Sequence, residues 1–158
     1  MKKLILAVLS IGGLAAVGTY AYKRSDLKLK EKDKKVQKFK NYYNMTNQWL
    51  QIRNQGRSLE EFFQKNGMNT IAVYGMGELG NRLYEELEKS SITVAYTIDK
   101  EADKKYSTVK VVGMEEEFDQ ADAIIVTPIF DYDEIKASLE SKTEMKIISL
   151  EEVIYGCI

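Results

Sequence analysis

A glycine-rich turn between a short apolar run and an amphipathic segment constrains the fold of this chain more than any other feature. Ile71 to Tyr74 is typical of a buried strand, and it leads directly into Gly75-Met76-Gly77-Glu78-Leu79-Gly80. Leu79, Leu83 and Leu87 then recur at helical spacing. Glycines at these three positions permit a tight turn, a close backbone approach and close packing of helix on strand. The segment therefore predicts a strand, a turn and a helix in succession.

The same turn predicts a site for a dinucleotide. A helix that begins after Gly77 presents free backbone N–H groups and the positive end of its dipole to phosphates. A second predicted strand, Thr93 to Ile98, is followed by Asp99, 24 residues after Gly75. A carboxylate there can accept hydrogen bonds from ribose hydroxyls and repels a 2′-phosphate, so NAD is expected rather than NADP. The alternative is a glycine turn that has lost its ligand.

The remaining apolar runs complete a parallel sheet. Alternating strands and helices predict a single α/β domain of Rossmann-like topology, with a five-stranded parallel sheet in the order 3-2-1-4-5. Its ligand crevice should lie at the carboxyl ends of strands 1 and 4, bordered by Thr127 and Pro128. The later elements expected are a strand at 109–112, at most two helical turns at 114–118, a strand at 123–127, a helix at 132–139 and a strand at 147–150.

The N-terminal segment is predicted to be a membrane anchor. Leu4 to Tyr22 is a run of 19 uncharged, mostly apolar residues, about the length of a helix that crosses a bilayer. A cleaved signal peptide and a buried core helix are the alternatives. Nine Lys or Arg residues lie at 23–40, against Lys2 and Lys3 before the run. The positive-inside rule therefore predicts a single-pass membrane protein with its C-terminal domain in the cytoplasm.

An aromatic-rich amphipathic helix is expected at 36–52, after the basic run. Its apolar face either packs on the chain's own domain or docks a protein partner or a second copy. Gly56 should end this helix, and Ser58 with Glu61 has the spacing of a capping box for a short helix that follows. The expected organisation is an anchor at 1–22, a basic and helical segment at 23–66, and a nucleotide-binding domain at 67–158.

Composition excludes several classes of function. The chain has no histidine and one cysteine, Cys157, so zinc sites, disulfides within the chain and histidine-based catalysis are not expected. Residues 59–158 hold 21 acidic and ten basic side chains, a balance that repels nucleic acid. Tyr132 and Lys136 have the spacing of a dehydrogenase acid–base pair, which we interpret as coincidence on an exposed helix.

The stretch from Ile71 to Pro128 resembles the small Rossmann-type domains of bacterial polysaccharide-biosynthesis proteins, those associated with nucleotide-sugar dehydratases and acyltransferases. The segments that carry the resemblance are the glycine turn, Ile98-Asp99, Val111-Val112-Gly113 and the strand from Asp122 to Pro128. It implies a nucleotide or nucleotide-sugar ligand held through Gly75, Gly77, Gly80 and Asp99. It implies no activity, because the catalytic domains of those families have no counterpart here.

Together these observations favour a membrane-anchored nucleotide-binding module, with NAD as the cofactor or a nucleotide-sugar as the alternative ligand, serving envelope polysaccharide biosynthesis. One other reading is an NAD-dependent oxidoreductase or epimerase-like enzyme completed by oligomerisation. Another is an interaction protein with a degenerate pocket. No catalytic residue is assigned. The candidate ligand-binding residues are Gly75, Met76, Gly77, Glu78, Leu79, Gly80, Asp99, Thr127 and Pro128.

Overall fold

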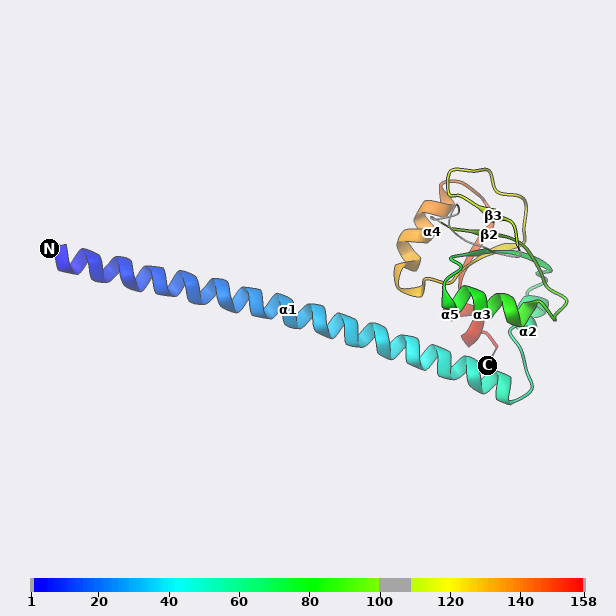
Figure 1. The fold of residues 1–158 in the computed structure, drawn as a ribbon, viewed down its shortest axis with the longest axis horizontal. Coiled ribbons are helices and arrows are strands. Elements are labelled where there is room, and N and C mark those ends of the chain that lie inside the picture. Colours follow the sequence, from blue (N-terminus) through cyan, green and yellow to red (C-terminus); the bar gives the residue numbers. More distant parts are fainter. Residues whose placement is uncertain (1, 100–108, 158) are drawn as a thin grey trace. The chain divides into compact units, whose positions relative to one another are not determined.

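The centre of the fold is a five-stranded, wholly parallel sheet (Figure 1). The computed structural model describes residues 2–99 and 109–157, with side chains from residue 22 onward. The strands lie in the order β3-β2-β1-β4-β5, which confirms the predicted α/β class and strand order. Such a sheet is consistent with a Rossmann-like fold. The strands are β1 (Thr70–Tyr74), β2 (Thr93–Ile98), β3 (Val111–Val112), β4 (Ala123–Val126) and β5 (Lys146–Ser149).

Helices cover both faces of the sheet, and alternate residues of each strand supply the two cores. On one face Ile71 and Val73 pack with α3 (Glu78–Leu87), α5 (Leu150–Tyr155), α2 (Glu60–Lys65) and the last turns of α1 (Lys2–Asn54). On the other face Ala72 and Tyr74 pack with α4 (Tyr132–Glu140), which follows the short helix η2 (Ile129–Asp131). This alternation places the side chain of Tyr74, the last residue of β1, on the α4 side of the sheet.

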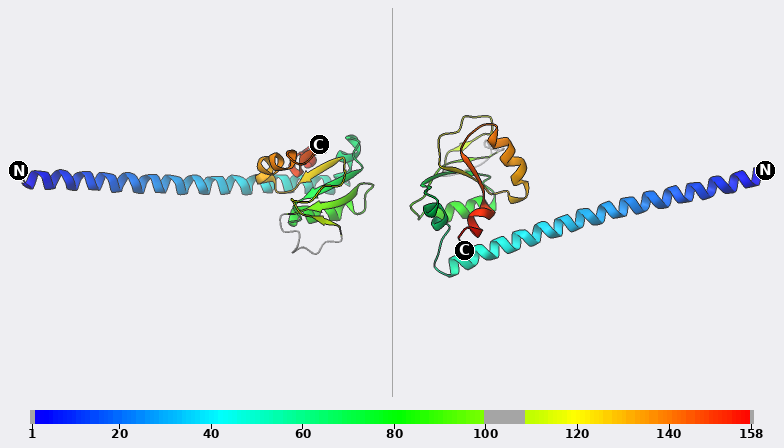
Figure 2. Two further views of the ribbon diagram at one scale, coloured as in Figure 1. Left: turned by 90° about the horizontal axis from the view of Figure 1, so that it is seen from above. Right: turned by 180° about the vertical axis from the view of Figure 1, so that it is seen from behind.

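Helix α1 is one uninterrupted helix, where the sequence suggested an anchor helix followed by a separate amphipathic helix. The reason is that no glycine or proline occurs between Gly18 and Gly56 to stop it. Figure 2 shows α1 as one continuous helical ribbon. The chain divides into two compact units, 1–43 and 44–158, and the division falls inside this helix. The last turns of α1, together with α2, therefore belong to the same unit as the sheet.

The apolar side chains expected on one face at 36–52 separate into two groups. Met45, Trp49 and Ile52 are buried in the core of the second unit, as expected for a face that packs on its own domain. Tyr42 is half-buried, and the other four residues of the face are exposed: Val36, Phe39, Tyr43 and Leu50. Docking of a partner or a second copy on these exposed residues remains a prediction.

Three local expectations differ from the structure. Leu59, rather than Ser58, is the N-cap residue of α2, and it makes no capping hydrogen bond through its side chain. The Glu61 carboxylate pairs with Arg57 at 2.7 Å. Residues 114–118 form a turn and a bend followed by irregular chain, rather than helix. Residues 150–155 form α5, which the sequence reading did not anticipate, and the Ser149 side chain caps it by accepting a hydrogen bond from the Glu152 amide.

The predicted anchor lies almost wholly outside the part of the chain whose side chains are described. Leu4 to Ala21 are among the residues without described side chains. Across the described residues, no helix combines the length and apolar character needed to cross a bilayer.

Candidate functional site

The glycine turn is held in a shape that only glycine fits at two of its three positions. Gly75 has a φ of +87°, and a Cβ there would come within 2.9 Å of the Pro128 ring. A Cβ on Gly80 would collide with the carbonyl oxygen of Gly75. Both glycines therefore fix how closely β1, α3 and the segment after β4 approach one another.

Gly77 differs from the other two glycines of the turn. Among the described residues, and apart from its own chain neighbours, no atom lies within 4 Å of a Cβ added to Gly77, and its φ of −74° suits any residue. Gly77 is the N-cap of α3, and the first helical hydrogen bond joins the Asn81 amide to its carbonyl oxygen at 3.0 Å. The N–H groups of residues 78–80 therefore precede the first intrahelical donor, which is the arrangement that binds anions at helix N-termini.

Asp99 lies beside the glycine turn, as the sequence predicts. Its carboxylate accepts a hydrogen bond from the Met76 amide at 3.2 Å, and the residue is 8% exposed. Its own amide donates to the carbonyl oxygen of Val112 on β3. The turn and the end of β2 are thus joined directly, and the carboxylate stands at the carboxyl edge of the sheet.

Thr127 supports the turn from the other side. Its hydroxyl lies 2.6 Å from the Gly75 carbonyl oxygen and 3.2 Å from that of Tyr74, so it can donate to either. The side chain is buried and does not line the pocket described next. Its role in the structure is to fix the path of the chain between β1 and α3.

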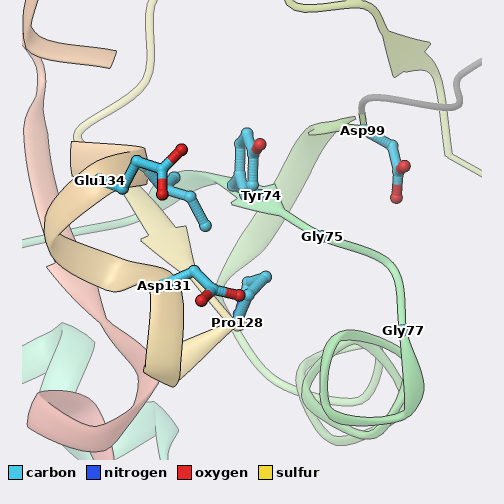
Figure 3. A pocket seen from close by; sticks show the side chains of 8 residues that line it. Tyr74, Gly75, Gly77, Asp99, Pro128, Asp131 and Glu134 are labelled. Atoms are coloured by element: carbon cyan, nitrogen blue, oxygen red, sulfur yellow. The ribbon is translucent and has the colours of Figure 1, made fainter. Parts of the chain in front are cut away.

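A pocket of about 430 Å³ opens at this edge of the sheet (Figure 3). Four of the predicted site residues line it: Gly75, Gly77, Asp99 and Pro128. The other five surround the turn without lining the pocket. Met76, Leu79, Gly80 and Thr127 are buried or half-buried around it, and Glu78 is exposed at the start of α3.

Sequence reasoning missed the other half of this pocket. Tyr74, Asp131, Glu134 and Ile135 also line it. Tyr74 was assigned only to the core of strand 1, and the other three were assigned to the segment and helix after β4. The topology offers a signal that could have found them. In a parallel sheet, the carboxyl end of one strand lies at the same edge as the start of the helix that follows the neighbouring strand.

The charged residues of the described pocket lining are all acidic. Asp99, Asp131 and Glu134 contribute carboxylates, and none of the described lining residues is Lys or Arg. Figure 3 shows Asp99 and Glu134 on either side of Tyr74. Burial, and then the negative charges of these two carboxylates, raise the pKa of Tyr74. Its hydroxyl therefore stays protonated and can donate a hydrogen bond at neutral pH.

Tyr132 and Lys136 take no part in this pocket. The Tyr132 hydroxyl donates to the Ile147 carbonyl oxygen at 2.9 Å, and the Lys136 ammonium lies 3.8 Å from the Glu140 carboxylate. Their spacing therefore carries no evidence for dehydrogenase chemistry.

Comparison with protein-family models, curated proteins and solved structures finds no match to this chain.

Proposed function

We propose that the domain is a nucleotide-binding module whose ligand occupies the pocket between the glycine turn and the start of α4. NAD is the expected ligand and a nucleotide-sugar the alternative. The observation that carries this proposal is the open space at Gly77, in the same pocket as the Asp99 carboxylate, which accepts the amide of the neighbouring Met76. In this proposal Gly77 and the start of α3 bind the phosphates, and Asp99 binds the ribose in the same pocket.

The phosphate part of the proposal rests on the contrast among the three glycines. Gly75 and Gly80 are required by contacts within the protein, whereas no described residue beyond the chain neighbours of Gly77 lies within 4 Å of the position of a Cβ on Gly77. We assign that space to the diphosphate of the ligand. There it would meet the N–H groups of the first turn of α3 and the positive end of the helix dipole.

The ribose part rests on Asp99. One oxygen of its carboxylate, Oδ2, accepts the Met76 amide, and a carboxylate offers about four acceptor sites over its two oxygens. A carboxylate at the end of the second strand can also accept hydrogen bonds from the hydroxyls of a ribose. A 2′-phosphate would bring further negative charge beside this carboxylate, so NADP should bind more weakly than NAD.

The tether is a further part of the proposal. The apolar run from Leu4 to Tyr22 would insert into the membrane, and the basic residues at 23–40 would lie at the cytoplasmic headgroups. We keep an envelope-polysaccharide role and an oxidoreductase or epimerase-like activity as secondary hypotheses. Neither gains a specific observation from the described lining of the pocket, which does not include Tyr132 or Lys136.

Calorimetric titration of the full chain in detergent micelles tests the proposal. NAD, NADP and a uridine diphosphate sugar would be titrated into the parent protein and into Gly77→Ala and Asp99→Asn variants. We expect a dinucleotide or nucleotide-sugar to bind the parent. Asp99→Asn should weaken it about tenfold or more, the usual loss when a hydrogen bond to a charged group is removed.

Gly77→Ala is the sharper variant, because the structure predicts normal folding together with impaired binding. Its thermal midpoint, measured without ligand, serves as the control. Asp133→Asn on the exposed side of α4 removes a carboxylate outside the pocket and should leave affinity unchanged. Absence of binding by every nucleotide, or unchanged affinity in both pocket variants, would overturn the proposal.

A further inference from the structure

The two ends of the pocket differ in what they offer a ligand. At the glycine turn, backbone N–H groups and the dipole of α3 favour negative charge. At the other end, Asp131 and Glu134 place two carboxylates beside Pro128 and Ile135, and no described lining residue neutralises them. A ligand that spans the pocket therefore meets a site for anions at one end and a negative field at the other.

We infer that the pocket selects a ribonucleoside ligand whose far end carries a positive charge, so that oxidised nicotinamide dinucleotide binds in preference to its reduced form. This inference rests on the proposed function and adds the charge of the ligand to it. The nicotinamide ring is cationic in NAD⁺ and neutral in NADH, while the rest of the two molecules is the same. A comparison of NAD⁺ with NADH therefore isolates the positive charge that Asp131 and Glu134 would recognise.

A metal ion is a poorer explanation of these carboxylates than an organic cation. Within the described residues, no three acidic, histidine or cysteine side chains come close enough together to form a metal site. Asp99 and Glu134 stand on opposite sides of Tyr74 (Figure 3). Carboxylates spread around a pocket can favour a delocalised cation through the field that they share, without direct coordination.

The raised pKa of Tyr74 agrees with this arrangement. Because both Asp99 and Glu134 act on its hydroxyl, the field of the two carboxylates extends across the middle of the pocket. The neutral phenol separates them and adds no charge of its own. Asp131 and Glu134 are exposed, so their effect on a ligand is moderate and should weaken as salt is added.

A second source of the same ligand chemistry is S-adenosylmethionine, which also joins a ribonucleoside to a cationic centre. Its sulfonium becomes a neutral thioether in S-adenosylhomocysteine. The two compounds form a second pair that differs in one charge. Testing both pairs distinguishes a dinucleotide ligand from a sulfonium ligand, because only the pair that fits the pocket should bind.

The experiment measures the dissociation constants of NAD⁺, NADH, S-adenosylmethionine and S-adenosylhomocysteine for the full chain in micelles at low salt. In the pair that binds, we expect the cationic member to bind about tenfold more tightly, the effect of one partly screened charge pair. The double variant Asp131→Asn and Glu134→Gln should reduce this ratio to about twofold or less. Added salt should reduce it as well.

Asp133→Asn is the matched control, because it removes a carboxylate from the first turn of the same helix without altering the pocket lining. It should preserve the preference. Equal or tighter binding of the neutral member overturns this inference and leaves the proposed function standing. So does a ratio that the double variant leaves unchanged. Failure of all four compounds and of a nucleotide-sugar to bind overturns the proposed function, and this inference with it.

Discussion

Glu86 on α3 should be the most sensitive polar residue in the described part of the fold. Its side chain is only 4% exposed, and its carboxylate accepts the Trp49 indole N–H at 2.7 Å and the Leu59 amide at 2.7 Å. Arg53 contacts the same carboxylate at 2.9 Å but is itself largely exposed. One side chain thus ties the end of α1 and the start of α2 to α3.

We expect Glu86→Ala to destabilise the domain by about 3 kcal/mol. Two buried donors lose their acceptor at about 1–3 kcal/mol each, and the exposed Arg53 pair adds little. The midpoint of thermal unfolding should fall by roughly 10 °C. Trp49 is the only tryptophan, so urea unfolding followed by its fluorescence reports directly on this contact.

Glu85→Ala is the matched control for that measurement. Glu85 is the preceding residue on the same helix, and its ion pair with Arg82 is exposed, so its loss should change stability by less than about 0.5 kcal/mol. Equal effects of the two substitutions would contradict this role of Glu86, and so would unchanged tryptophan fluorescence in a destabilised Glu86→Ala protein.

Three further predictions follow from other parts of the chain. Gly80→Ala should cost about 3 kcal/mol, because its Cβ would overlap the Gly75 carbonyl, and thermal unfolding would detect the loss. Two backbone amides at the start of β1 lower the pKa of Asp122. These hydrogen bonds therefore stabilise the fold fully above about pH 4, and their contribution is lost as the pH falls through the lowered pKa of Asp122 in the folded state. Asp122→Asn should remove this pH dependence of stability from acid unfolding curves. Reporter fusions at the C-terminus should be active in the cytoplasm, and removal of Leu4 to Tyr22 should release the chain from the membrane fraction.

The sheet could be predicted because each strand has a local signature. Apolar runs bounded by glycine, proline or acidic residues mark β1, β2 and β4 to within a residue. Helix α5 could not be found in this way, since it follows β5 without a loop and its apolar residues Leu150, Val153 and Ile154 continue the strand's own apolar character. The expected capping box is incomplete because the helix begins one residue later, so that Leu59, whose side chain cannot accept a hydrogen bond, is the N-cap residue.

The candidate site was predictable on one side only. Gly75, Gly77 and Asp99 follow from a motif whose spacing is fixed by backbone geometry. Asp131 and Glu134 carry no motif, and they reach the pocket only because β4 lies beside β1 and α4 begins at the same edge. The same is true of Glu86, whose partners lie 27 to 37 residues away in the chain and are brought to it by packing.

Selective nitrogen-15 labelling of the ten glycines offers the most direct test of a ligand at the glycine turn. Nuclear magnetic resonance spectra of the full chain in micelles would be recorded as NAD⁺ is added. We expect the amide signals of Gly75, Gly77 and Gly80 to move together. The signals of Gly56 and Gly67, which follow the ends of α1 and α2, should stay in place. Two results would contradict a ligand at the glycine turn. One is movement of the Gly56 and Gly67 signals without movement of the signals from the turn, and the other is saturable binding of NAD⁺ that leaves the Gly77 signal unchanged.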